Sequence, residues 1–164
     1  RLGSQVAQAL SSQATARPDD ARSLLAAAQQ ARGADKPDPG NHDHDQVKQW
    51  IAKGDSLLAS GHFDDANTAF QRAIDVDTGA GAAFEGLAEV AFNQGDNSRA
   101  VLAAKRAVAL APTAISYRMT LAKAYYKLMR YDDAIQQWNK VVELDPENSV
   151  AKKDIELARA RSAH

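Results

Sequence analysis

The chain of 164 residues contains no cysteine. Disulfide bonds, thiol catalysis and thiolate metal sites are therefore excluded. A chain without cysteine fits a reducing and an oxidising compartment alike, so the location stays open, with the cytoplasm slightly favoured and the periplasm as the alternative. The chain begins at Arg1, and we expect it to be a piece of a larger or processed protein whose targeting signals lie outside this sequence.

An excess of charge of one sign and long apolar runs are also lacking. The formal net charge is −1, which offers no general attraction to nucleic acid or to an anionic membrane surface. No apolar run approaches the length of about 20 residues that spans a bilayer. Aromatic residues make up only 6% of the chain, whereas 45% of it is hydrophobic and about a fifth is alanine. Such a composition favours closely packed helices.

The feature that organises the sequence is self-similarity at a period of 34 residues. Three windows, which begin at Val47, Gly81 and Ile115, align without a gap. A fixed period of this length indicates stacked supersecondary units. The aligned columns, in window order, are Trp50, Phe84 and Arg118; Gly54, Ala88 and Ala122; Leu57, Ala91 and Tyr125; Ala66, Ala100 and Ala134; Phe70, Ala104 and Trp138; Ala73, Ala107 and Val141; Thr78, Pro112 and Pro146.

Each window divides into two halves with a helical pattern. Apolar residues recur at a spacing of three and four, as between Ala82 and Asn93, which is typical of one helical face. A short turn follows, and the second half opens with carboxylates or a hydroxyl, which suit the free N–H groups of a helix start. The columns of small residues mark helix crossings, because only small side chains let two axes approach to about 8–10 Å. The larger residues fill the spaces between neighbouring hairpins.

A window of this length with an early aromatic residue, small residues at two crossings and a late proline resembles the tetratricopeptide repeat (TPR). The third window matches best, especially from Tyr131 to Ile135 and from Val142 to Pro146. The resemblance implies an all-α, right-handed α-α superhelical solenoid of three hairpins, residues 47–80, 81–114 and 115–148, with a capping helix at 149–163. The alanine-rich style is similar to bacterial TPR adaptors. The departures from the family pattern, which loosen local turns, are Thr78, Asn97 and Met129.

The segments outside the repeats are less regular. Residues 1–32 are rich in alanine and glutamine, and they are either a degenerate helical hairpin packed on the repeats or a partly helical lead-in. Residues 33–46 hold two prolines and two glycines, which predicts a flexible linker. In the capping helix we expect Val150, Ile155 (with Ala151 and Ala158) and Leu157 to face inward, because a terminal unit needs a polar outer face.

The residues able to carry chemistry form no convincing catalytic set. The stretch from Asn41 to Asp45 alternates histidine and aspartate, but no rigid element supports it, so a solvated linker is favoured over a metal site. His62 is expected to be a surface turn residue. The carboxylate pair Glu85 and Glu89 lacks the enclosed site that acid–base catalysis needs. We therefore expect no enzyme, no cofactor and no metal.

In the family that the chain resembles, the first helix of each unit lines a concave face. Around apolar anchors of the kind that dominate interface energy, this face would be acidic at Asp55, Glu85 and Glu89 and basic at Lys123 and Lys127. A partner segment with apolar side chains, a basic end and an acidic end would be complementary. The predicted partner-binding groove consists of Lys48, Ile51, Asp55, Leu58, Glu85, Glu89, Phe92, Asn93, Met119, Lys123, Tyr126 and Lys127.

One subfamily is excluded by its motif. TPR co-chaperones hold the acidic C-termini of cytosolic chaperones with a clamp of lysines, asparagines and an arginine. That clamp is absent here, because the corresponding positions hold Ile51, Asp55, Gly86, Ser116 and Thr120.

The leading hypothesis is a protein–protein interaction module that binds a peptide, a helix or a small protein in this groove. Two alternatives stay open: a self-associating structural subunit, and the non-catalytic arm of a multidomain enzyme or regulator. Leu58 and Phe92 have an alternative interpretation too, in which neighbouring helices or the N-terminal segment cover them.

Overall fold

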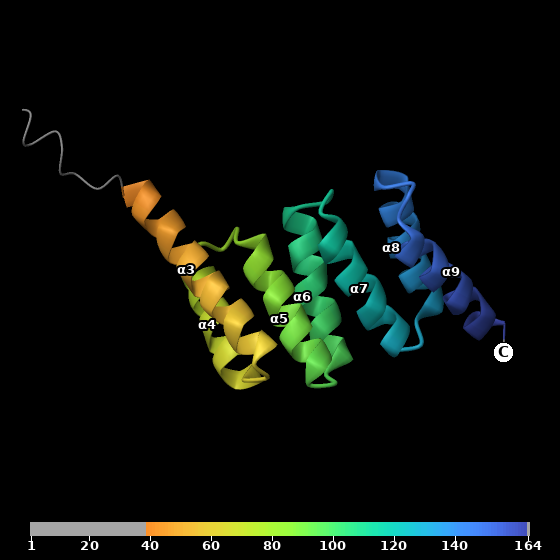
Figure 1. Cartoon of the computed structure of the whole chain (residues 1–164), viewed down its shortest axis with the longest axis horizontal. Helices are drawn as coiled ribbons and strands as arrows, with labels where there is room; N and C mark the ends of the chain where they lie inside the picture. Colours follow the sequence, from red (N-terminus) through yellow and green to blue (C-terminus); the bar gives the residue numbers. More distant parts are fainter. Residues whose placement is uncertain (1–38, 164) are drawn as a thin grey trace, which may run out of the picture. The chain divides into compact units, whose positions relative to one another are not determined.

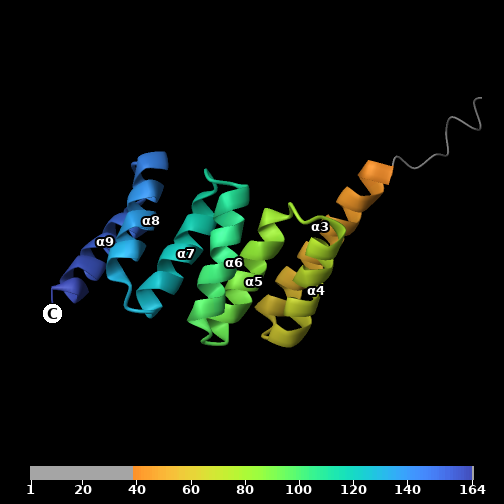
Figure 2. The ribbon, with the colours of Figure 1, turned by 180° about the vertical axis from the view of Figure 1, so that it is seen from behind.

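The computed structural model describes residues 39–163, and nearly all of them belong to the unit Gly40–His164. The expected N-terminal segment, residues 1–32, lies outside the described residues. In both ribbon views the helices follow one another in chain order (Figure 1, and from behind Figure 2). The expected all-α solenoid is confirmed. Its helices are α3 (Pro39–Ala59), α4 (Phe63–Val76), α5 (Gly81–Asn93), α6 (Asn97–Leu110), α7 (Ile115–Lys127), α8 (Tyr131–Leu144) and α9 (Ser149–Ser162).

Helix α3 begins well before Val47, where the repeat pattern places its start. The linker predicted for residues 33–46 is therefore wrong from Pro39 onward, while residues 33–38 lie outside the described part. The physical reason is that proline fits the first helical turn, where its missing N–H leaves no hydrogen bond unmade. The side chains from His42 to Asp45 are exposed, so the helix extends without burying these polar groups.

The first crossing is filled by Phe70 of α4. Its side chain is fully buried in a cluster that includes Val47 of α3 and Val90 of α5. A Cβ atom added at Gly54 of α3 would lie 2.5 Å from ring atom Cε1 of Phe70, and one added at Gly86 of α5 would lie closer still. The phenyl ring therefore occupies the space that two absent side chains leave on the neighbouring helices.

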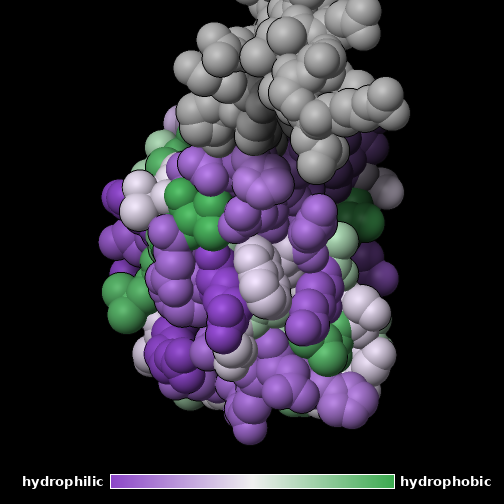
Figure 3. Space-filling model, turned by 90° about the vertical axis from the view of Figure 1, so that its left-hand side faces the viewer, coloured by the Kyte–Doolittle hydropathy of each residue, from purple (hydrophilic) through white to green (hydrophobic). Residues whose placement is uncertain are grey.

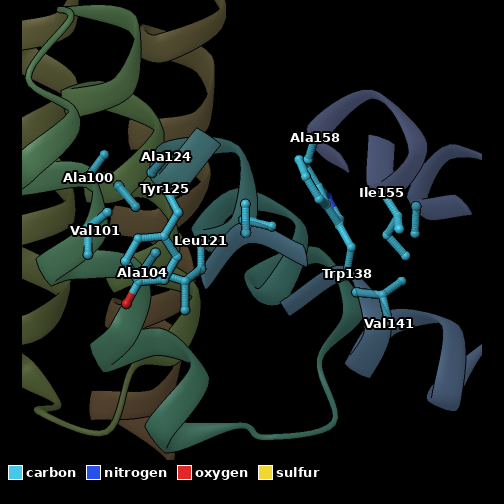
Figure 4. Packing of buried hydrophobic residues seen from close by; sticks show 14 of the residues in the cluster. Ala100, Val101, Ala104, Leu121, Ala124, Tyr125, Trp138, Val141, Ile155 and Ala158 are labelled. Atoms are coloured by element: carbon cyan, nitrogen blue, oxygen red, sulfur yellow. The ribbon is translucent and has the colours of Figure 1, made fainter. Parts of the chain in front are cut away.

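The second core cluster runs through the later hairpins. Tyr125 of α7 packs against Val101 and Ala104 of α6, and Trp138 of α8 lies against α9 (Figure 4). Ala104 occupies the column of Phe70, so a small side chain fills the second crossing where a large one fills the first. The crossing is closed instead by the tyrosine of the next hairpin.

The turn inside each hairpin places one residue in the left-handed region. The φ angle is 77° at Gly61, 81° at Gly95 and 58° at Met129. Glycine adopts this conformation without steric cost, but methionine does not. Met129, which stands where the family pattern has glycine, keeps the turn and leaves its side chain 73% exposed.

Helix α9 covers the end of the second core cluster with Ala151, Ile155 and Ala158. The prediction that Val150 and Leu157 face inward is wrong, because they are 55% and 47% exposed. The buried residues are spaced by three and four and share one face of the helix, and this face excludes the other two positions.

Candidate functional site

The twelve predicted groove residues lie on the first helices of the hairpins, α3, α5 and α7. The apolar members among them are half-buried, and each of the twelve keeps some accessible surface. Leu58 and Phe92 are partly covered, because each packs against a core cluster, and each keeps accessible surface. Whether these twelve residues bind a partner stays a prediction.

A hollow of about 270 Å³ opens between α3, α5 and α7. Five of its lining residues belong to the predicted groove, and the sixth, Thr120, does not. Because three helices from three consecutive hairpins contribute, the hollow exists only in the stacked repeats. It is lined by Leu58, Glu89, Phe92, Asn93, Thr120 and Lys123.

A second hollow of about 200 Å³ adjoins the first and shares Phe92 and Lys123 with it. The aromatic ring of Tyr126 is held in place here, since its centroid lies 5.3 Å from that of Tyr131 and 6.0 Å from that of Trp138. Offset and edge-on aromatic pairs of this kind are favourable. The hollow is lined by Phe92, Lys123, Tyr126, Lys127, Trp138, Asp154 and Leu157.

Three carboxylates give the groove its acidic part. Burial raises the pKa of Asp55 on α3 and the pKa values of Glu85 and Glu89 on α5. Asp55 raises both glutamate pKa values further, while Ser116 acts in the opposite direction on Glu85. In the part of the chain that the structure describes, none of the three forms an ion pair. The acidic side of the groove therefore carries charges that the described cations leave uncompensated at short range.

Two lysines of α7 give the groove its basic part. Lys123 lowers the pKa of Glu89, although burial outweighs it. The Lys127 ammonium group lies 6.0 Å from the centroid of the Phe92 ring, the upper end of the range for a cation–π contact. The apolar side chains that line the two hollows therefore lie between the acidic part and the basic part of the groove.

Not every predicted residue reaches a hollow. The predicted residues that line neither of them are Lys48, Ile51, Asp55, Glu85 and Met119, and the apolar two, Ile51 and Met119, pack against the core clusters.

Sequence reasoning also missed four lining residues, Thr120, Trp138, Asp154 and Leu157. The last two lie on α9, outside the repeat columns, so the period carried no signal for them. A helical wheel of α9 built around its three small or branched buried positions could have found Leu157.

Residues 42–163 contain no cluster of three or more histidine, aspartate or glutamate side chains that could hold a metal ion. None of the helices from α3 to α9 combines the length and the apolar character that a membrane-crossing helix requires.

Comparison with known families decides the affiliation. Two family models, both described as tetratricopeptide repeat, match residues 51–115 and 116–148. The chain belongs to the tetratricopeptide repeat family. Members of this family are built as protein-interaction modules, and the TPR helices here carry the hollows described above.

Among curated TPR relatives, the chain is 35% identical over 107 residues to the protein CTR9 homolog of Arabidopsis thaliana, which covers 65% of the chain and 10% of that protein. It is 28% identical over 122 residues to small glutamine-rich tetratricopeptide repeat-containing protein 2 of Mycosarcoma maydis, over 74% of the chain and 34% of that protein. The chain thus spans at most about a third of these relatives. A bacterial origin stays a prediction.

Solved TPR structures have the same fold. The first TPR of Spaghetti (RPAP3), bound to the HSP90 peptide SRMEEVD, superposes with a TM-score of 0.71 at 20% identity, over 73% of the chain and 95% of that structure. MamA superposes with a TM-score of 0.68 at 21% identity, over 88% of the chain and 80% of that structure.

Proposed function

We propose that the TPR unit is a scaffold or adaptor that holds a peptide, a helix or a small protein in the concave groove of α3, α5 and α7. The observation that carries the proposal is the pair of adjoining hollows, which share Phe92 and Lys123 and together draw residues from five helices. An apolar side chain of the partner fits each hollow, because well-packed pockets that exclude water give the largest contributions to binding.

The charges of the groove orient the partner. Asp55, Glu85 and Glu89 face its α3–α5 side, and Lys123 and Lys127 face its α7 side. A bound segment therefore places its basic end toward α3 and its acidic end toward the lysines of α7. Complementary charges of this kind select the partner and its direction more than they add to affinity.

The three neighbouring carboxylates, whose pKa values are raised by desolvation, also support a binding role. Like charges held together in partly buried positions cost stability, since desolvation and mutual repulsion both disfavour them. Natural proteins break local stability rules mainly at functional sites. A cationic group of the partner offsets both the desolvation of the carboxylates and their mutual repulsion.

The proposal separates this unit from its structural neighbours. The HSP90 and HSP70 peptides bound by the RPAP3 TPR domains have the sequences SRMEEVD and SGPTIEEVD, and both end in acidic residues. Here Asp55 stands at one of the positions that the chaperone clamp uses. We therefore expect that a fluorescein-labelled SRMEEVD peptide shows, in fluorescence anisotropy, no saturable binding that is weakened by replacing Phe92 and Tyr126 with alanine, with the first TPR of RPAP3 as the positive control. Saturable binding that these two groove substitutions weaken would contradict the proposed polarity of the groove.

The groove itself is tested by selecting random peptides displayed on phage against the full chain and titrating the enriched peptides. Replacing Phe92 and Tyr126 with alanine is expected to weaken binding by about tenfold or more, because two aromatic anchors are lost. Helical circular dichroism is expected to stay unchanged. The matched control replaces Leu110 and Leu144, which are exposed apolar residues outside both hollows. Equal affinity of all three proteins for every enriched peptide would contradict the groove.

We propose binding rather than catalysis as the activity of the unit. Two further roles remain as proposals. Self-association is favoured by the exposed apolar side chains of Leu144, Val150 and Leu157 near the C-terminal end, and sedimentation at increasing concentration tests it. A role as the non-catalytic arm of a larger protein is supported by the small share of the relatives that the chain spans.

A further inference from the structure

The hairpins carry a second series of hollows, between the two helices of one hairpin. In the middle hairpin a hollow of about 320 Å³ is bounded by α5 and α6. Its position on α5 differs from that of the concave groove, because Leu87 lies roughly 160° around the helix from Glu85 at 3.6 residues per turn. We call it the middle furrow, and it is lined by Phe84, Leu87, Ala91, Arg99, Leu102, Ala103 and Arg106.

The first hairpin has the same hollow one period earlier. Its lining of Trp50, Lys53, Leu57, Asp65, Thr68, Ala69 and Arg72 corresponds to the middle furrow residue by residue at a shift of 34 positions. The hollow is therefore a product of the hairpin geometry. What the fold does not require is the apolar character of the middle furrow, since Lys53 and Thr68 stand in the first hairpin where Leu87 and Leu102 stand in the second.

In the third hairpin, side chains at and near the corresponding positions contact one another. Arg118 replaces the aromatic residue at the start of the column, and its guanidinium group donates a hydrogen bond of 3.1 Å to Oε1 of Gln137. Arg130 lies over the Tyr125 ring at 4.6 Å. Of the two hollows, that of the first hairpin is lined by one leucine, Leu57, and the middle furrow by two, Leu87 and Leu102.

Leu102 is the clearest departure. Its side chain is 69% exposed, while the equivalent positions hold the polar residues Thr68 and Gln136. A leucine at a position that the repeat geometry leaves in water gains nothing for folding, and burying it against a partner contributes apolar contact area.

The charge of α6 identifies the partner chemistry. Helix α6 contains three cations, Arg99, Lys105 and Arg106, and no carboxylate, whereas α4 and α8 each contain three carboxylates and one cation. Arg106 also lies over the Phe84 ring at 5.8 Å, but Arg72 makes the equivalent contact with Trp50, so this arginine belongs to the hairpin. Arg99 is specific to the middle hairpin, because Asp65 and Asp133 occupy its column. It makes only a long, exposed ion pair with Asp96, at 3.9 Å.

We propose that the middle furrow is a second docking surface, which binds an acidic protein segment through an apolar side chain seated against Leu87 and Leu102 and carboxylates facing Arg99 and Arg106. This surface is independent of the concave groove. The charged residues that line it are both basic, Arg99 and Arg106, whereas the groove has an acidic and a basic side. One TPR unit then connects two different partners.

The neighbouring hairpin supplies the test variants. Leu87→Lys with Leu102→Thr gives the middle furrow the residues of the first hairpin, which the same fold already accommodates. Arg99→Asp does the same for the charge. The phage selection against the full chain is repeated with each variant and with the Phe92→Ala, Tyr126→Ala protein as competitors in solution, and the enriched peptides are titrated individually.

We expect a class of peptides rich in aspartate and glutamate around a leucine or phenylalanine. Their affinity falls about tenfold or more in the Leu87→Lys, Leu102→Thr protein and in the Arg99→Asp protein, and it is unchanged by the groove substitutions. If no enriched peptide responds to the furrow variants, or if those that respond are basic, the second docking surface is overturned. Peptides that respond only to the groove variants would overturn it while leaving the concave groove intact.

Discussion

The first two hairpins follow the same helical path but fill it with different side chains. At the crossing, Phe70 of the first is fully buried against two glycines, whereas Ala104 of the second is fully buried beside Ala88. On the surface, α4 is mainly acidic and α6 is basic. The end of the unit at α3 and α4 is mostly hydrophilic (Figure 3), while the middle hairpin exposes Leu102.

This difference shows which columns the fold constrains and which it leaves free. Protein interiors are packed to nearly constant density, so a large residue on one helix requires small ones on its neighbours. The fold therefore constrains the summed volume of the side chains that meet at a crossing, and it does not fix the size of the residue at any single position of the column. Packing does not constrain the residues at surface positions in this way. Differences between hairpins at these positions therefore indicate where partners bind.

The largest loss of stability is expected when Phe70 of the first hairpin is replaced by alanine, the residue that the second hairpin has at the equivalent position, Ala104. Phe70→Ala leaves a cavity between Gly54 and Gly86, and loss of a buried phenyl ring typically costs about 3–5 kcal/mol. Urea unfolding of the full chain measures the loss. The glycines cannot fill the space, so a loss below about 1 kcal/mol would mean that the two crossings are interchangeable.

A smaller loss is expected from Gly86→Ala. The added methyl group meets the buried Phe70 ring, and overpacking of this kind costs about 1–3 kcal/mol, from which the better helix propensity of alanine recovers up to about 1 kcal/mol. The double variant with Phe70→Leu is the control, because a smaller side chain makes room. Full additivity of the two substitutions in a double-mutant cycle would contradict the shared volume.

The turns of the hairpins offer a stabilising substitution. Met129→Gly gives the third hairpin the glycine of the first two, and relief of the left-handed conformation is expected to stabilise the chain by about 0.5–1 kcal/mol. Its exposed side chain has little packing to lose. Gly95→Ala is the mirror experiment and lowers the melting temperature. A lower melting temperature for Met129→Gly would show that its side chain contributes more than its backbone costs.

The smallest effect is expected from the carboxylates that the first two hairpins share on the concave face. The pKa of Glu89 is raised in the folded state, so the folded chain binds this proton more tightly than the unfolded chain, and stability from this group increases as the pH falls through the range just above its ordinary pKa. Glu89→Gln therefore raises the melting temperature at neutral pH, and the gain disappears in acid. Glu147→Gln, an exposed glutamate, is the control. A gain that persists in acid would exclude a protonation origin.

The repeat period predicted the helices, the turns and the crossings because each depends on residues within one window. It missed the early start of α3, since a proline that begins a helix looks the same as one that interrupts a coil. The two glycines around Phe70 illustrate a second limit: Gly86 is required by a residue of the preceding hairpin, and no single column contains that information.

The candidate site was predictable to the same extent. The family resemblance placed Phe92, Lys123 and Tyr126 on the concave face, and the structure brings them together around two hollows, whose binding role stays a prediction. Leu157 and Asp154 were not predicted as groove residues because they belong to the helix after the last repeat. The middle furrow was not predicted from the sequence, because it is recognised only when the surface of one hairpin is compared with that of its neighbours.

The concave groove is proposed to hold a partner segment with a basic and an acidic end. Amide chemical-shift mapping of the full chain, titrated with the strongest phage-selected peptide of this class, examines that proposal residue by residue. We expect the largest shift changes on α3, α5 and α7 around Leu58, Phe92 and Tyr126, with the basic end of the peptide nearest Asp55. Largest changes on α4, α6 and α8 would contradict the groove as the binding face.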